Sequence, residues 1–194
     1  MPRILASMVV AITGLLATTI AQAAPVAEED RVAIDLRRTT LIVESIENSL
    51  RFYRDALGMK VIYDNMIRTP RTATTDEEAE LSRRLVFLRA NDDYIGIVGL
   101  LEYTRPRRPI REPEPADFSS GSVVLLFNTA DVDEAYAAAV AVPGAEPIGP
   151  PADVTYPSYD GSSALRVRTS TLRDPDGFLV ELNQLLSEID NTGR

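Results

Sequence analysis

The 194-residue chain contains neither cysteine nor histidine. Without cysteine it forms no disulfide, offers no thiolate nucleophile and has no residue for an N-terminal lipid anchor. Without histidine it lacks the usual general acid–base residue, the Ser-His pair of hydrolases and every metal site that requires an imidazole. The two absences therefore exclude the commonest hydrolase and metalloenzyme chemistries.

The N-terminus has the pattern of an export signal. Arg3 precedes a mostly apolar run over residues 4–20, and the small-x-small tripeptide 21–23 follows this run. The order predicts a signal peptide over residues 1–23 and an extracytoplasmic protein, periplasmic or secreted. Because the run is 17 residues long, an uncleaved membrane anchor is the alternative. Residues 24–30 are polar and acidic, and we interpret residues 24–36 as a flexible lead-in.

The mature chain is acidic. Without residues 1–23 it has 19 basic and 29 acidic side chains, a net charge near −10. Such a surface repels nucleic acid and anionic lipid. We therefore expect neither nucleic acid nor, after signal removal, a membrane as a partner.

Two parts of the chain repeat one pattern. Ser45 follows a half-buried strand pattern and caps a helix that Gly58 closes, and Asp131 and Gly144 take the same two places later. The cap and the closing glycine are 13 positions apart in both parts, and the offset between the parts is 86 residues. The last strands of the two parts are offset by 82 residues. This agreement predicts two duplicated strand-helix-strand-strand-strand modules.

The modules are expected to span residues 37–102 and 121–186. Between them, residues 103–120 hold four prolines and four arginines, which is typical of a linker. This basic segment is a solvated connector, a lid or an anion-recruiting rim, and a partner-binding surface over residues 103–111 is a further alternative. Residues 187–194 are read as a C-terminal tail.

The stretch LRDPDGFLVELNQ, residues 172–184, organises the second module. Pro175 and Gly177 predict a tight turn, with a positive φ at the glycine. In the strand that follows, Glu181 and Asn183 share one face, opposite an apolar face that packs against helices. Glu181 is therefore either a solvated side chain or a group in a cleft.

These segments resemble the vicinal oxygen chelate superfamily, which includes glyoxalase I, bleomycin-resistance proteins, fosfomycin-resistance enzymes and extradiol dioxygenases. The resemblance is carried by SIENSLRFYRDALGMKVIY, DVDEAYAAAVAVPGAEP and RDPDGFLVELNQ. It implies an α+β fold in which two tandem βαβββ modules, with curled mixed sheets, enclose a shared cleft and carry their helices outside.

The resemblance also implies where metal-using members hold their cation. Those four positions fall on Arg38, Gly99, Val124 and Glu181, and only Glu181 can ligate a metal. Neighbouring oxygens such as those of Thr40 and Asn128 do not complete the set. We therefore expect no metal ion and no cofactor, and metal-dependent glyoxalase or dioxygenase activity is not expected.

Two interpretations of the cleft remain open. In the structural one, Arg38 and Glu181 form a buried ion pair in place of the cation. In the functional one, Arg38 joins Arg166 and Arg168 in holding an anionic ligand, because Leu165 and Val167 are expected to face the helix. The candidate ligand-binding residues are Arg38, Thr40, Arg166, Arg168, Glu181 and Asn183.

The function predicted first is therefore an exported, metal-independent protein that binds a small molecule, neutral or anionic, in its cleft. The alternative is a metal-independent isomerase, lyase or dioxygenase-like enzyme with Glu181 as general base. An adjacent Arg38 would oppose the raised pKa that this base needs. With two modules in one chain, a monomer or a homodimer is expected.

Overall fold

The computed structural model describes residues 27–109, 119–158 and 161–190, with side chains described through residue 187. The expected signal peptide and half of the expected linker, residues 110–118, lie outside the described residues. The lead-in is extended and exposed from residue 31 to residue 37, after a single 3-10 turn, η1, at Glu28–Asp30. None of the helices in the described part of the chain has the length and hydropathy needed to cross a membrane.

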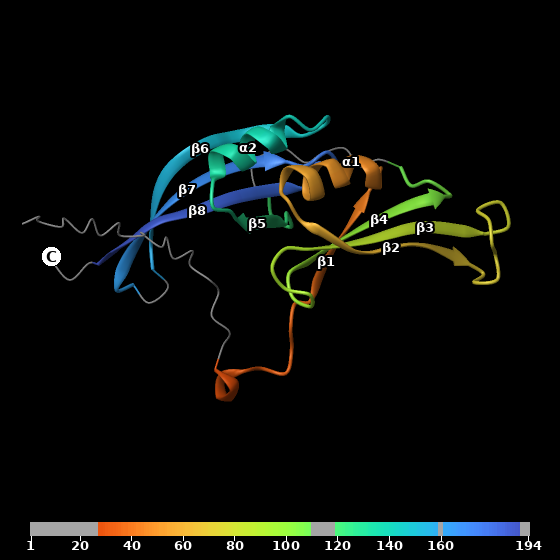
Figure 1. The fold of residues 1–194 in the computed structure, drawn as a ribbon, viewed down its shortest axis with the longest axis horizontal. Helices are drawn as coiled ribbons and strands as arrows, with labels where there is room; N and C mark the ends of the chain where they lie inside the picture. The colour runs from red at the N-terminus through yellow and green to blue at the C-terminus, as the bar shows by residue number, and fades with distance from the viewer. Residues whose placement is uncertain (1–26, 110–118, 159–160, 191–194) are drawn as a thin grey trace, which may run out of the picture.

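Each module forms one mixed four-stranded sheet and one helix (Figure 1). The elements of the first module are β1 (Arg38–Val43), α1 (Ile46–Leu50), the π-helical turn η2 (Arg51–Ala56), β2 (Lys60–Thr69), β3 (Leu81–Arg89) and β4 (Ile97–Arg105). Those of the second are β5 (Val124–Asn128), α2 (Val132–Val140), β6 (Glu146–Pro157), β7 (Ser163–Arg173) and β8 (Leu179–Asp190). The strand orders β1-β4-β3-β2 and β5-β8-β7-β6 are the same, which confirms the predicted α+β fold of two βαβββ modules.

The strand register agrees with the duplication. Thr40 pairs with Gly99 across the parallel β1 and β4, and Leu126 pairs with Glu181 across the parallel β5 and β8. Thr40 and Leu126 are 86 residues apart, and Gly99 and Glu181 are 82 residues apart, which are the two offsets found in the sequence. Corresponding residues of the modules therefore occupy corresponding places.

Both helices are capped as predicted. The Ser45 hydroxyl accepts a hydrogen bond from the Asn48 amide at 3.4 Å, and the Asp131 carboxylate accepts one from the Glu134 amide at 3.0 Å. Such side-chain acceptors satisfy amides that a helix leaves unpaired at its first turn.

A second acceptor reaches each helix start from the last strand of the module. The Ile46 amide donates to Glu102 at 3.0 Å, and the Val132 amide donates to Gln184 at 3.2 Å. The last strand therefore fixes the start of the helix in the same way in both modules.

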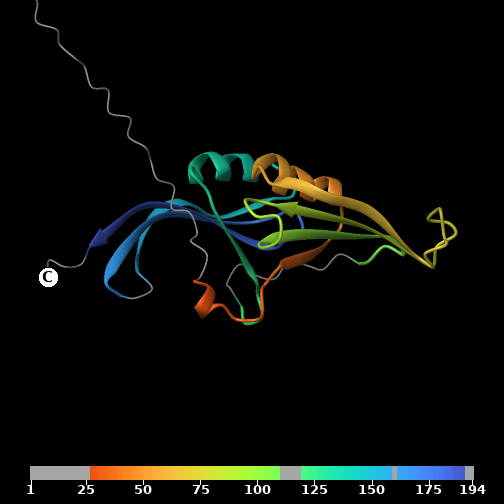
Figure 2. The same ribbon diagram turned by 60° about the horizontal axis from the view of Figure 1, so that its bottom comes forward.

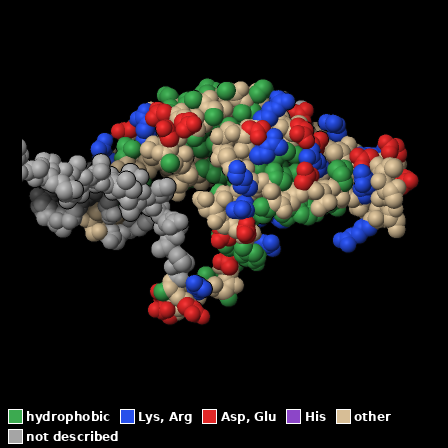
Figure 3. All heavy atoms as spheres, in the orientation of Figure 1, with side chains coloured by type: hydrophobic (Ala, Val, Ile, Leu, Met, Phe, Trp, Pro, Cys, Tyr) green, Lys and Arg blue, Asp and Glu red, His purple; other side chains and the backbone are tan. Residues whose placement is uncertain are grey.

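The helices lie side by side on one side of the two sheets, as Figures 1 and 2 both show. We call the opposite side of each sheet its inner face. The apolar core fills the space between helices and sheets, and its largest fully buried members include Phe52, Tyr53, Leu88, Leu100, Leu172 and Leu182. The helix side of the molecule carries ion pairs such as Arg84–Asp64, and acidic and basic side chains are interspersed over the face shown in Figure 3.

Several strands are longer than their sequence patterns indicate. β3 includes the polar residues Ser82, Arg83 and Arg84, because β2 and β4 pair with them on both sides. β4 continues to Arg105, into the expected linker, and β8 continues to Asp190, into the expected tail. Backbone pairing thus extends strands through residues whose side chains are polar.

Candidate functional site

The turn between β7 and β8 joins the two modules. One oxygen of Asp174 accepts hydrogen bonds from the amides of Asp176 and Phe178, which shapes the turn, and Gly177 has the predicted positive φ of 88°. The other oxygen accepts a 2.7 Å hydrogen bond from the hydroxyl of Tyr53, which belongs to η2 of the first module. The local sequence that makes the turn therefore also supplies an anchor for the other half of the chain.

Asp176 adds a second connection. Its two carboxylate oxygens accept from the Glu44 amide at 2.6 Å and from the Ser49 hydroxyl at 2.9 Å. Both donors lie at the β1–α1 junction of the first module. The turn 174–177 thus connects the second module to the first through two carboxylates.

Burial changes the ionisation of this turn. Asp174 is 1% exposed, and loss of water raises its pKa to about 6, although the Tyr53 hydroxyl and two amides favour the charged form. Burial also raises the pKa of Asp176, and burial together with the Asp174 charge raises that of the Tyr53 hydroxyl. Tyr53 is therefore a hydrogen-bond donor to Asp174 across the neutral pH range.

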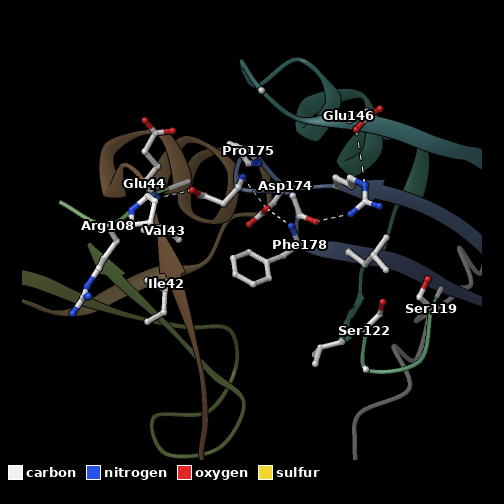
Figure 4. Close-up of a pocket in the computed structure, with 18 of the residues that line it drawn as sticks. Ile42, Val43, Glu44, Arg108, Ser119, Ser122, Glu146, Asp174, Pro175 and Phe178 are labelled. Atoms are coloured by element: carbon white, nitrogen blue, oxygen red, sulfur yellow. Dashed lines mark hydrogen bonds and ion pairs between the residues drawn. The ribbon is translucent and has the colours of Figure 1, made fainter. Parts of the chain in front are cut away.

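A cavity of about 900 Å³ lies beside this turn, between the modules. Figure 4 shows Ile42 and Arg108 on one side of it, Ser119 and Ser122 on the other, and Phe178 between them. Its walls also include Tyr103, Glu44, Glu146, Arg173, Asp174 and Leu179. β1, β4, β7, β8 and the linker ends all contribute to this cavity, but none of the six candidate ligand-binding residues is in its lining.

Arg173 is a buried cation in the cavity wall. It is 4% exposed, donates to the Gly177 carbonyl at 2.7 Å and lies 3.9 Å from Glu146. The hydrogen bond holds the guanidinium against the turn. Sequence analysis missed Arg173, although it directly precedes the Asp-Pro-Asp-Gly turn motif and could have been assigned to it.

Next to the cavity, the inner face of the first module carries Arg38. Its Nε donates to the Thr40 hydroxyl at 3.0 Å, and its guanidinium carbon lies 4.1 Å from the centre of the Phe87 ring. The stem of Arg38 crosses Gly99, where an added Cβ would approach the Arg38 Cδ to 3.2 Å and the Thr40 Oγ1 to 2.8 Å. Glycine is required at this position because Arg38 and Thr40 fill the space beside it.

On the second module, Glu181 and Asn183 lie on the inner face, as predicted. Their neighbours Val180 and Leu182 are fully buried on the helix side. The Asn183 amide donates to the Glu181 carboxylate at 3.0 Å. The other amide atom of Asn183, Oδ1, is buried and has no partner among the described residues.

Two expectations about the arginines are wrong. Arg168 does not face the cleft: it donates to Asp133 of α2 at 2.7 Å and to Asp153 at 2.8 Å, and Arg166 approaches the same Asp153 at 3.4 Å. Both side chains therefore lie on the helix side of the sheet. Within the described residues, moreover, Arg38 and Glu181 form no ion pair with each other.

The positions that resemble a metal centre do not suit one. Arg38 places a permanent positive charge there, Gly99 and Val124 have no donor atom, and Glu181 supplies a single carboxylate. A transition metal needs about three or more protein ligands of suitable type. No cluster of three or more acidic side chains that could hold a metal ion occurs in the described ranges. The residues present therefore do not fit a bound metal ion.

Comparison with known proteins agrees with this architecture. The family model described as "Glyoxalase/Bleomycin resistance protein/Dioxygenase superfamily" matches residues 35–182. A glyoxalase family protein from Bacillus cereus superposes with a TM-score of 0.60 and 17% identity, over 83% of this chain and 100% of that chain. At this identity the likeness concerns the fold alone.

Two further solved structures are more distant. A glyoxalase I mutant from Zea mays gives a TM-score of 0.48 and 20% identity, over 77% of this chain and 46% of that one. A glyoxalase/bleomycin resistance protein/dioxygenase family enzyme from Burkholderia phytofirmans gives a TM-score of 0.46 and 15% identity, over 79% of this chain and 100% of that one. No curated protein matches the chain.

Proposed function

Because the chain belongs to the glyoxalase/bleomycin resistance protein/dioxygenase superfamily, we propose that it binds a small molecule in the cleft between its two modules without a metal ion. The observation that carries this proposal is the cavity of about 900 Å³ beside the turn 174–177. Cavities of roughly 300–1,000 Å³ with an apolar lining and a few polar groups are typical of small-molecule sites.

The lining of the cavity combines apolar and polar groups. Ile42 and Phe178 offer apolar contact, while Ser122 and Arg108 offer hydrogen-bond donors. Metal independence is supported by the donor set, in which a guanidinium and a glycine occupy two of the four family positions. Binding through side chains alone is the chemistry that these residues can perform.

The proposal is tested by filling the cavity. Ile42→Trp places a large ring at the cavity wall, and Ile62→Trp is the matched control on β2, where the side chain is also exposed but does not line the cavity. We expect compounds from a small-molecule library to raise the Tm of the wild-type and Ile62→Trp proteins but not that of Ile42→Trp. Equal shifts in both variants, or loss of binding after treatment with a chelator, would overturn the proposal.

An enzyme is the second candidate, and the Asn183–Glu181 hydrogen bond on the inner face is the observation that favours it. In that case Glu181 abstracts a proton from the bound molecule. Glu181→Gln would then abolish turnover of a compound while leaving its affinity within about threefold. Unchanged turnover would exclude Glu181 as the base.

We also propose that the protein is exported, on the evidence of the apolar run after Arg3. A C-terminally tagged chain should appear in the extracytoplasmic fraction in a form shortened by residues 1–23. A full-length chain in the cytosolic fraction would contradict export.

A further inference from the structure

The inner face of the first module carries arginines that are not neutralised, although the protein is acidic. Six other described arginines pair with carboxylates: Arg54, Arg68, Arg84, Arg89, Arg166 and Arg168. Among the described residues, no carboxylate lies within ion-pair distance of Arg38, Arg83 or Arg108. Arg38 and Arg83 thus place two guanidinium groups without a carboxylate partner on this face, and Arg108 adjoins them.

These three arginines belong to one continuous surface. The strand register places Arg83 opposite Tyr103 and Phe87 opposite Gly99, so the inward side chains of β1, β3 and β4 form neighbouring rows. We call this surface the inner wall, made up of Arg38, Thr40, Arg83, Leu85, Phe87, Gly99, Leu101, Tyr103 and the adjoining Arg108. Its Tyr103 and Arg108 also line the cavity.

Aromatic rings, rather than carboxylates, position two of the guanidinium groups. Arg38 lies 4.1 Å from the Phe87 ring centre and Arg108 lies 4.6 Å from that of Tyr103. Phe87 is itself stacked on Tyr63, with 4.8 Å between the ring centres. A ring contact holds a guanidinium in place while leaving N–H donors at its edge for a planar acceptor.

Arg83 provides an independent observation. Its Nε is buried and has no hydrogen-bond partner among the described residues. A buried donor without a partner is costly, and a ligand oxygen that accepts from it removes this cost. The unsatisfied donor therefore points to an anion or another acceptor at the inner wall.

The inner face of the second module exposes apolar surface. Leu126, Leu185 and Tyr156 are among its exposed large side chains, with exposed fractions of 54%, 47% and 42%. The strand register puts all three on the inner face, with the same alternation as Glu181 and Asn183. The inner faces of the two modules thus differ: the first carries arginines and aromatic rings, and the second exposes large apolar side chains.

We propose that the ligand is an aromatic anion, a carboxylate or phosphate on a planar apolar body, whose charged group binds Arg38 or Arg83 on the inner wall. This inference rests on the proposed function and names its ligand class. The planar body stacks on the ring–guanidinium surface of the wall. Carboxylate and phosphate share the bidentate acceptor geometry that guanidinium recognises.

The test compares three probes of similar shape, 2-naphthoate, 2-naphthyl phosphate and the neutral 2-naphthamide, by isothermal titration calorimetry on the mature protein. We expect at least one anion to bind about tenfold or more tightly than the amide, and to bind more weakly as salt is raised. Arg38→Gln or Arg83→Gln should weaken binding of the anion about tenfold or more without affecting the amide. Arg54→Gln, a paired arginine on the helix side, is the matched control and should change nothing.

Arg38→Lys separates charge from shape, because it retains the charge and loses the planar fork; we expect it to recover only part of the affinity. Equal binding of anions and amide, absence of binding by all three probes, or insensitivity to both glutamine substitutions would each overturn the inference. The Ile42→Trp experiment remains independent: library compounds that lose binding there would sustain the proposed function even if the anion probes fail.

Discussion

The contact between Tyr53 and Asp174 predicts a stability effect that depends on pH. Tyr53→Phe removes the hydroxyl 2.7 Å from the Asp174 carboxylate and leaves one carboxylate oxygen buried without a donor. Above the Asp174 pKa of about 6 that oxygen is charged, and leaving a buried charged group unsatisfied costs about 2–3 kcal/mol. At pH 5 most of the carboxyl is protonated, so the expected cost is about 1 kcal/mol.

The direction in which pH changes the stability of the wild-type protein follows from the same raised pKa of Asp174. Burial raises the pKa of Asp174 above its ordinary value of 3.8, so between these values the folded protein binds more protons than the unfolded chain. The stabilising contribution of Asp174 is therefore present near pH 4 and is lost as the pH rises to about 6. At higher pH it no longer changes. Two pKa units correspond to at most about 3 kcal/mol.

The assay is urea unfolding at pH 5 and pH 8, followed by far-ultraviolet circular dichroism because the chain has no tryptophan. Tyr136→Phe, in half-buried α2, is the matched control and should cost little at either pH. Asp174→Asn, which mimics the protonated side chain, should flatten the pH dependence between 4 and 6. An equal cost of Tyr53→Phe at both pH values, or a cost no larger than that of Tyr136→Phe, would refute the reasoning.

Other predictions concern the first module and the helix starts. Gly99→Ala forces a Cβ to 2.8 Å from the Thr40 hydroxyl and should lower the unfolding free energy by about 1–3 kcal/mol; thermal melts check this, and Thr40→Ala in the same chain should recover part of the loss. If Gly99→Ala were neutral, the space beside Arg38 would be larger than the structure indicates. Glu102→Ala and Gln184→Ala remove the acceptors of the first helical amides and should each cost about 1 kcal/mol in urea unfolding, with the larger loss for the charged residue. No loss at Gln184 would show that water replaces the acceptor.

Local signals in the sequence predicted most of the fold. Ser45, Asp131 and Gly177 act through short-range rules of capping and turn geometry, and the repeated spacing depends only on counting. The extent of β3 could not be predicted, because Ser82 and Arg83 are polar and become strand residues through pairing with strands far along the chain.

The site was less predictable, for two physical reasons. Leu165 and Val167 were read as helix-facing because they are apolar, whereas the inner face of β7 is apolar too and takes them, so Arg168 lies against α2. The contact of Tyr53 with Asp174 spans 121 residues, and no local pattern reports such a distance. The alternation of side chains shows which residues share a face of a strand. It does not identify which face packs against the core when both faces carry apolar residues.

The duplicated modules have the same topology but different inner faces, and this difference has a consequence for how a molecule sits between them. Two identical halves would make a twofold-symmetric cleft in which a ligand binds equally well in either of two opposed orientations. Here Gly99 opposite Thr40 in one half corresponds to Glu181 opposite Leu126 in the other. The cleft therefore has a direction, and an asymmetric ligand should adopt a single orientation with the same end always toward the first module.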